Sequence, residues 1–206
     1  MRKILLIVFI PVLFFSCREE YKSFKEKYNY ELLHKLLIIG RKSIMEEFKN
    51  KKYSHFIELK YSDTDIGVIF RIKKMGKERG CISFIRGVSS LEEAVRTAAI
   101  NAAFFDSRFE PLEEEELNYL EVEAGIIGKF KEIKNKKNFK IGIDSLLLND
   151  PLNRTFLQGK IAMEDKLSKT EFLNTLCKKA GLKEGSYKNE NIKIFKAYTV
   201  YLKEKF

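Results

Sequence analysis

Helix-type and strand-type hydrophobic patterns alternate along this chain, and this alternation most limits the folds that it can adopt. Between residues 30 and 49, mainly apolar positions recur at intervals of three and four, which predicts a helix with one buried stripe. Those positions are Leu33, Leu36, Leu37, Gly40, Ile44 and Phe48. Residues 66–72 are β-branched and largely apolar, which predicts a strand, and residues 75–77 predict a turn into a second strand at 79–85.

The second half of the chain mixes helix and strand patterns without regular spacing. Ser90 with Glu93 and Ser168 with Glu171 form capping-box patterns, each predicting the start of a helix, and Gly181 is expected to close the second helix. Four further segments are strand-like: residues 119–127, 139–148, 154–162 and 192–202. This order favours an α+β fold with a mainly antiparallel sheet flanked by helices over a doubly wound parallel sheet. One domain is expected, although 206 residues also allow a larger lobe with a smaller one.

The amino terminus has the outline of a secretory signal. Arg2 and Lys3 precede an apolar run at residues 4–15, which is too short to span a bilayer because a spanning helix needs about 20 apolar residues. Ser16 and Cys17 follow, and this junction resembles the lipobox of bacterial lipoproteins, in which the cysteine thiol is acylated after cleavage. An uncleaved anchor is the alternative, and both versions place an exported protein on a membrane.

This reading divides the chain into three parts. Residues 1–16 are expected to be a lipoprotein signal peptide, and residues 17–28, which are largely polar, a tether with order beginning after Tyr28. Residues 29–206 are then the folded domain. The formal charge of +10 falls to +8 when Arg2 and Lys3 are removed. In an exported protein this charge suits anionic lipid headgroups rather than nucleic acid, but a solvated lysine-rich surface is the preferred interpretation.

Cysteine and histidine usage excludes several kinds of site. If Cys17 is acylated, only Cys81 and Cys177 remain, and neither has metal-ligand spacing. Two free thiols are preferred to a bridge between them. The two histidines, His34 and His55, lie near no cysteine or carboxylate motif, so no catalytic cysteine–histidine pair is indicated. Glycine-rich phosphate loops, nucleophile elbows and paired metal motifs are also missing from the sequence, so neither cofactor nor metal is predicted.

Strand alternation gives Cys81 a polar neighbourhood. Side chains of a strand point alternately to its two faces, so Cys81 shares one face with Arg79 and Ser83, and Gly80 lies on the other. In residues 119–127 the same rule places Glu121 and Glu123 on a polar face. If both strands lie in one sheet, a guanidinium, a thiol and two carboxylates converge, and Gly80 admits close backbone approach. The alternative is that Cys81 is a small buried residue and that Arg79 forms a structural ion pair with Glu121 or Glu123.

Three stretches of the sequence resemble the AMMECR-one domain family: "RGCIS", "SLEEAVRTAAINAAFFDSRFEPLEEEELNYLEVE" and "KTEFLNTLCKKAGL". The resemblance covers roughly residues 30–200. Within the family's hallmark, Glu78 and Ser83 replace a leucine and a glycine. The resemblance implies an α+β fold with a larger and a smaller lobe and with the hallmark lining a cleft. Its family-like positions are Arg79, Gly80, Cys81, Ile82, Asn101, Asp106, Arg108, Phe109, Pro111, Glu121 and Glu123.

The resemblance implies no settled reaction, but it associates prokaryotic relatives with MEMO-family and radical-SAM proteins in small-molecule modification. Our first hypothesis is a membrane-tethered domain that binds or modifies a small molecule, with Cys81 as the catalytic thiol. The expected ligand-binding residues are Arg79, Gly80, Ser83, Asn101, Asp106, Arg108, Glu121 and Glu123. Among them, Arg79 and Arg108 would bind anions and Glu121 or Glu123 would accept a proton. The second hypothesis is a non-enzymatic module that binds a protein partner at the membrane.

Overall fold

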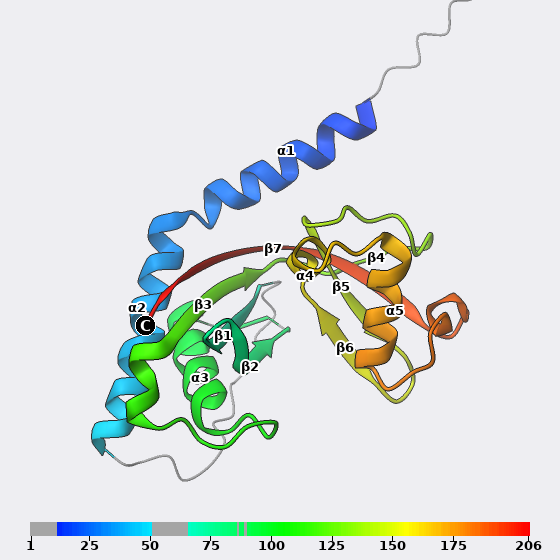
Figure 1. The fold of residues 1–206 in the computed structure, drawn as a ribbon. Helices are drawn as coiled ribbons and strands as arrows, with labels where there is room; N and C mark the ends of the chain where they lie inside the picture. The colour runs from blue at the N-terminus through cyan, green and yellow to red at the C-terminus, as the bar shows by residue number, and fades with distance from the viewer. Residues whose placement is uncertain (1–11, 51–65, 86, 89) are drawn as a thin grey trace, which may run out of the picture.

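The computed structural model describes residues 12–50, 66–85, 87–88 and 90–206, and it confirms the α+β fold (Figure 1). His55 and residues 1–11 of the expected signal peptide lie outside the described residues. The helices are α1 Val12–Lys27, α2 Tyr30–Asn50, α3 Leu91–Phe104, α4 Gly159–Glu164 and α5 Lys169–Lys179, with 3₁₀ turns at Glu114–Tyr119 and Ser186–Lys188. The strands are β1 Gly67–Lys74, β2 Lys77–Phe84, β3 Leu120–Ile127, β4 Lys131–Glu132, β5 Asp144–Asn149, β6 Arg154–Leu157 and β7 Lys193–Lys205.

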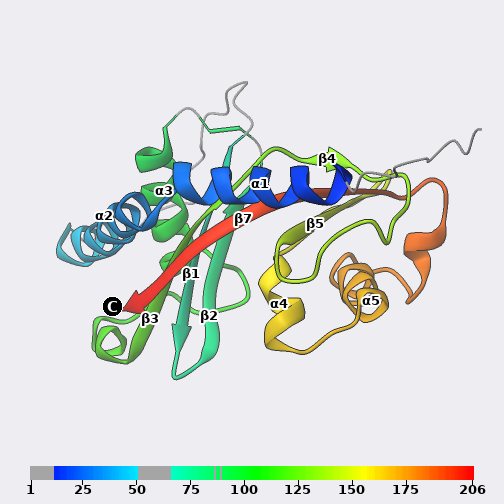
Figure 2. The ribbon, with the colours of Figure 1, turned by 90° about the horizontal axis from the view of Figure 1, so that it is seen from above.

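One antiparallel sheet runs through the whole molecule, in the order β2-β1-β3-β7-β5-β6, with β4 also paired to β7. The long strand β7 belongs to two lobes (Figures 1 and 2). Its residues 199–205 pair with β3 in the larger lobe, which also contains α2, α3, β1 and β2. Its residues 193–198 pair with β5 in the smaller lobe, which also contains α4, α5 and β6.

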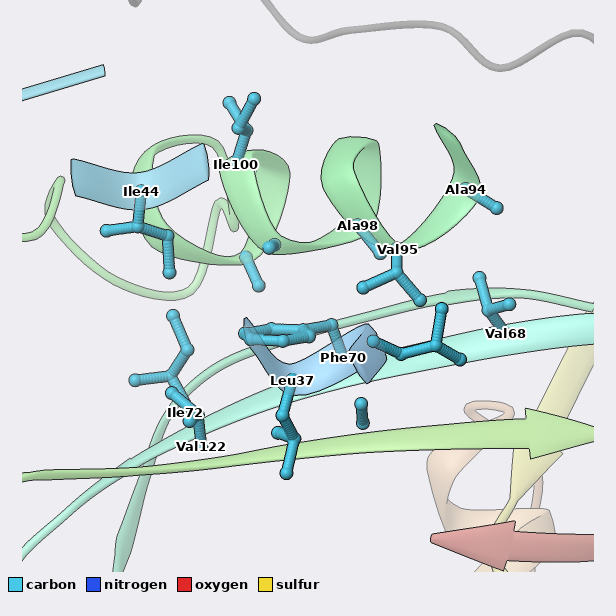
Figure 3. Close-up of a cluster of buried hydrophobic side chains, with 14 of the residues drawn as sticks. Leu37, Ile44, Val68, Phe70, Ile72, Ala94, Val95, Ala98, Ile100 and Val122 are labelled. Carbon is cyan, nitrogen blue, oxygen red and sulfur yellow. The ribbon is translucent and has the colours of Figure 1, made fainter. Parts of the chain in front are cut away.

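Each lobe has its own hydrophobic core because each presents an alternating strand face to amphipathic helices. In the larger lobe, the even-numbered side chains Val68, Phe70 and Ile72 of β1 point toward α3 (Figure 3). The smaller lobe packs Phe172 and Leu176 of α5 against β5 and β7. The opposite face of β1, β2, β3 and β7, which faces away from α2 and α3, is called the inner face below.

Most local signals are confirmed. Ser168 and Glu171 form a reciprocal capping box at the start of α5, while the Ser90 hydroxyl accepts a hydrogen bond from the Glu93 amide at the start of α3. Gly181 closes α5 with a φ of 73°. Cys81 and Cys177 are both free thiols. Local sequence chemistry therefore determines these helix boundaries well.

Two strand predictions are too long. Residues 139–143 precede β5, which begins only at Asp144, and the predicted strand at 154–162 ends at Leu157 and continues as α4. The chain turns at Gly159, whose amide donates to the Ser145 hydroxyl at 2.9 Å. A Cβ at Gly159 would lie 2.4 Å from the carbonyl oxygen of Asp144, so this close approach requires glycine.

The segment expected to be an unstructured tether is helical, so the expectation that order begins after Tyr28 is wrong. The ring centroids of Tyr21 and Phe24 in α1 lie 5.4 and 5.9 Å from that of Tyr198 in β7. This aromatic contact anchors one side of a mainly polar helix to the sheet, because a pair of aromatic rings stabilises a fold by more than the burial of its surface alone. In Figure 2, α1 is seen crossing over β7.

Within the described part of the chain, no helix combines the length and the apolar character needed to span a membrane.

Candidate functional site

The inner face carries a row of three functional groups from neighbouring strands. Arg71 in β1 is paired directly with Cys81 in β2 on one side and with Glu123 in β3 on the other. Directly paired residues point to the same face of a sheet, so the guanidinium lies between the thiol and the carboxylate. The structure thus brings Cys81 and Glu123 to one face, and the basic group between them is Arg71, which the sequence analysis did not single out.

Arg79 does not join this row, because a β-bulge interrupts the alternation of β2. Ile72 pairs with Gly80 but the next residue, Lys73, pairs with Glu78, which leaves Arg79 without a partner in the register. Glu78 therefore joins the inner face, where its Oε2 lies 3.2 Å from Arg71 Nε. The expectation that Arg79 lies beside the Cys81 thiol is wrong.

Gly80 faces α3 and not the inner face. A Cβ at this position would lie 2.0 Å from the carbonyl oxygen of Ala102, so the close approach expected at Gly80 is made by a helix backbone. The glycine of the hallmark thus allows α3 to pack on β2.

Arg79 instead binds Glu116, a residue that the sequence analysis did not identify as important. Its Nε and Nη2 donate to the two carboxylate oxygens at 3.1 and 2.8 Å, and Lys74 Nζ donates to the same carboxylate at 2.8 Å. Burial alone would raise the pKa of Glu116, but the hydrogen bonds from Arg79 and Lys74 outweigh it and lower the pKa to about 2. Arg79 is therefore part of a structural ion pair, but its partner is Glu116 and not Glu121 or Glu123, the partners considered from sequence.

Acid is expected to weaken this ion pair. Since the folded-state pKa of Glu116 lies below its ordinary value of 4.5, its stabilisation is complete above that pH and is lost as the pH falls toward 2. Glu116→Gln should therefore lower the free energy of unfolding by about 2 kcal/mol at neutral pH and by much less near pH 2. Urea unfolding measures both values, with the exposed Glu115→Gln as the matched control. An equal loss at the two pH values would contradict this assignment.

Asp106 and Arg108 fasten the edge of the sheet. β2 is an edge strand, and the outward amide of Cys81 donates to Asp106 Oδ2 at 2.8 Å. Arg108 donates to Asp106 and, at 2.6 Å, to Glu78 Oε1. Burial would raise the pKa of Asp106, but the hydrogen bonds from Arg108 and from the Cys81 amide lower it. These two predicted ligand-binding residues therefore hold the hallmark strand in place, and half of the Arg108 side chain stays exposed.

The other predicted ligand-binding residues are dispersed. Asn101 is fully buried in α3. Ser83 lies on the inner face, where it pairs with Ile69, and Glu121 forms an ion pair with Lys203 at 3.1 Å. The structure therefore places Ser83 and Glu121 on the same face as Cys81, and it separates Asn101 from it.

The smaller lobe contributes Lys160 of α4, which forms a buried ion pair with Glu123 and lies 4.4 Å above the ring of Tyr201. Only 2% and 4% of the Lys160 and Glu123 side chains are exposed. Burial lowers the pKa of Lys160, and the negative charge of Glu123 opposes this shift. Lys179 at the end of α5 also interacts electrostatically with Cys81. Charged side chains from both lobes therefore meet at the inner face, and no sequence pattern indicated that these residues lie close together.

The Cys81 thiol is partly buried between polar and apolar groups. It packs against a small apolar cluster that includes Ile69 and Phe156. Burial raises its pKa, and the positive charge of Arg71 and a hydrogen bond with Arg71 offset only part of this rise. Since the thiolate is the nucleophile, Cys81 is a weak nucleophile at neutral pH.

Alkylation is expected to reflect this raised pKa. The rate of iodoacetamide labelling at Cys81 should rise with pH along a curve displaced above that of a free cysteine, and Arg71→Leu should displace it further. Peptide mass spectrometry resolves Cys81 from the other cysteines. A rate that already levels off at neutral pH would contradict the raised pKa.

Four enclosed polar atoms at this site have no hydrogen-bond partner among the described residues: Arg71 Nε, Glu123 Oε1 and both amide atoms of Gln158. Gln158 is 2% exposed and precedes α4 in an extended conformation, so its side chain shares the face of Phe156. No group of three or more metal-ligating side chains is found within the described residues. The arrangement is therefore suited to hydrogen bonding with a polar molecule.

Comparison with known proteins agrees with the resemblance seen in the sequence. Residues 37–201 match the family described as AMMECR1. The chain is 32% identical to protein SSO0193 of Saccharolobus solfataricus, over 87% of this chain and 84% of that one. It is 33% identical to a protein of Sulfolobus acidocaldarius, over 82% and 79%.

A solved structure has the same fold. The crystal structure of uncharacterized protein PH0010 from Pyrococcus horikoshii superimposes with a TM-score of 0.75 at 26% identity, covering 85% of this chain and 93% of that one. Sequence and fold agree over both lobes, and the chain belongs to the AMMECR1 family.

Proposed function

We propose that this chain binds a small polar molecule at the inner face, between Arg71 and Cys81 of the larger lobe and Gln158 of the smaller lobe. The observation that carries the proposal is the set of enclosed polar atoms without partners at Glu123 and Gln158. Each unpaired buried polar atom costs about 1–3 kcal/mol, and native proteins pair nearly all of them with protein, water or ligand.

The chemistry of these atoms defines the ligand. Glu123 Oε1 requires a hydrogen-bond donor, and the Gln158 amide requires both a donor and an acceptor. A molecule with adjacent N–H and carbonyl groups, such as an amide or a nucleobase edge, meets these requirements. Cys81 contacts this ligand as a neutral thiol, since its raised pKa disfavours the nucleophilic role first expected of it.

The variant Gln158→Leu tests whether the chain binds a ligand at this position. Native mass spectrometry of the full chain, purified without denaturation, is expected to show a bound small molecule that the variant loses. Asn138→Leu, which replaces an exposed amide elsewhere, is the matched control and should keep it. Identical spectra for the three proteins, with or without a bound molecule, would overturn the proposal.

The same variant has an expected effect on stability. Gln158→Leu should raise the free energy of unfolding of ligand-free protein by about 1 kcal/mol, because an apolar side chain of similar size replaces two unpaired polar atoms. Urea denaturation after exhaustive dialysis measures it. A large loss of stability would instead show that the amide has partners within the fold.

Membrane attachment is the second part of the proposal. It rests on the sequence: residues 1–16 form the signal peptide, Cys17 is acylated and becomes the amino terminus, and residues 17–28 link it to the domain at 29–206. Because α1 contacts β7 from Glu20 onward, the lipid would be attached about 4.5 Å along the helix from the folded body. Intact-mass analysis should show loss of residues 1–16 and addition of acyl chains, and a chain that retains them would contradict cleavage.

A protein-interaction module is the alternative function, and the half-exposed Arg108 favours it. Asp106 and Glu78 hold its guanidinium in one orientation, which lowers the entropic cost of binding a carboxylate on a partner. MEMO-family or radical-SAM proteins are the partners that the resemblance implies. A pull-down from solubilised membranes should lose its partner with Arg108→Ala and keep it with Arg96→Ala, and an unchanged set of bound proteins would count against this function.

A further inference from the structure

A cavity lies on the other side of β7, beneath α1. Its volume is about 750 Å³, within the range typical of small-molecule sites. Its apolar lining comes from α1, the connection to α2, the residue before β1, and β7: Phe24, Tyr28, Ile66, Ala197 and Tyr198. It is separate from the inner face, because Tyr198 points to the opposite side of β7 from Thr199 and Tyr201.

Asp144 supplies a buried polar group to this cavity. It lines the cavity and pairs directly with Tyr198, so its side chain lies on the face of β7 that α1 covers. Only 1% of the side chain is exposed. Oδ2 accepts the Lys140 amide at 2.8 Å and lies 3.5 Å from Lys196 Nζ, whereas Oδ1 has no hydrogen-bond partner among the described residues. A buried carboxylate oxygen without a partner requires a donor.

The charged rim of the cavity is nearly balanced. Four lysines and three carboxylates line it; Lys131 lies 3.6 Å from Glu20, and Lys196 lies 3.5 Å from Asp144. The net charge of the rim therefore discriminates little between cationic and anionic ligands. The unpaired oxygen of Asp144 and the aromatic rings decide the chemistry of the occupant.

We propose that this cavity binds a small amphiphilic amine, whose protonated nitrogen donates to Asp144 Oδ1 and whose apolar body packs against Phe24 and Tyr198. A charge-assisted hydrogen bond in a buried site fixes the orientation of the amine, and the aromatic rings provide an apolar surface for the rest of the ligand. The helix α1 is the roof of the site, held by the contacts of Tyr21 and Phe24 with Tyr198 and by a 3.4 Å hydrogen bond from the Tyr198 hydroxyl to Glu20.

Binding of phenethylamine to the full chain tests the site, with 3-phenylpropionate as the ligand of opposite charge. Titrations followed by the backbone amide resonance of Gly128, a lining residue, should show at least about tenfold tighter binding of the amine, equivalent to about 1.4 kcal/mol. Asp144→Asn should remove this preference. Equal binding of the two ligands, or no binding of the amine at about 10 mM, would overturn the proposal.

A second variant, which fills the cavity, tests the site even if Asp144→Asn does not fold. Ser23 is exposed on α1 and lines the cavity, so Ser23→Trp should fill the space and abolish binding of the amine. Lys25→Trp adds the same ring to an exposed position of α1 outside the lining, and it should leave affinity unchanged. Amine binding that survives Ser23→Trp places the ligand elsewhere and overturns the proposal.

Discussion

Lys160→Met is expected to lower the free energy of unfolding by about 3–5 kcal/mol, because it leaves the Glu123 carboxylate buried without its counter-charge. The side chains of this pair are 2% and 4% exposed, so water cannot replace the missing ammonium group. Glu123 Oε1 already has no hydrogen-bond partner among the described residues, which increases the cost of losing the only partner of Oε2 found there.

The double variant Lys160→Met/Glu123→Leu separates loss of the pair from loss of packing. It should recover most of the stability, because apolar replacement of a whole buried ion pair is often neutral or stabilising. Lys203→Met is the control at the exposed pair with Glu121, where 49% and 34% of the side chains are exposed, and it should cost at most about 1 kcal/mol. Chemical denaturation measures all three, and equal losses for Lys160→Met and Lys203→Met would contradict the buried role of this pair.

Gly80→Ala is expected to cost at least about 3 kcal/mol, or to prevent folding, because its Cβ would overlap the Ala102 carbonyl oxygen at 2.0 Å. The neighbour is the backbone of α3, which cannot move aside as a flexible side chain would. Relief would require α3 to separate from β2, together with the residues of its buried face such as Val95 and Ala99.

Ser83→Ala is the matched control for this substitution. It changes a residue of the same strand on the inner face and should alter stability by no more than about 0.5 kcal/mol. Thermal and urea unfolding of both variants measure the difference. If Gly80→Ala unfolds like the parent protein, the tight packing of α3 on β2 is not required for the fold.

Features that depend on residues close together in the sequence were predictable. The alternation in β3 correctly placed Glu121 and Glu123 on one face, and the Ser168 capping box correctly gave the start of α5. These signals depend on residues a few positions apart, whose geometry is fixed by the strand or helix period.

Features that depend on distant contacts were not predictable. The bulge that turns Arg79 toward Glu116 has no local marker, since its position is set by pairing with β1. Lys160 and Glu123 are 37 residues apart and lie on different lobes, so no pattern connects them. The polar composition of residues 18–28 concealed the rings by which α1 packs on Tyr198.

The continuity of β7 limits how the two lobes can move. A single strand of 13 residues forms backbone hydrogen bonds with both halves of the molecule, so no flexible linker separates the two lobes along this strand. Exchange of the ligand proposed at the inner face would then proceed by rotation of side chains or by displacement of the short helix α4, and not by domain closure. The halves should also melt as one cooperative unit.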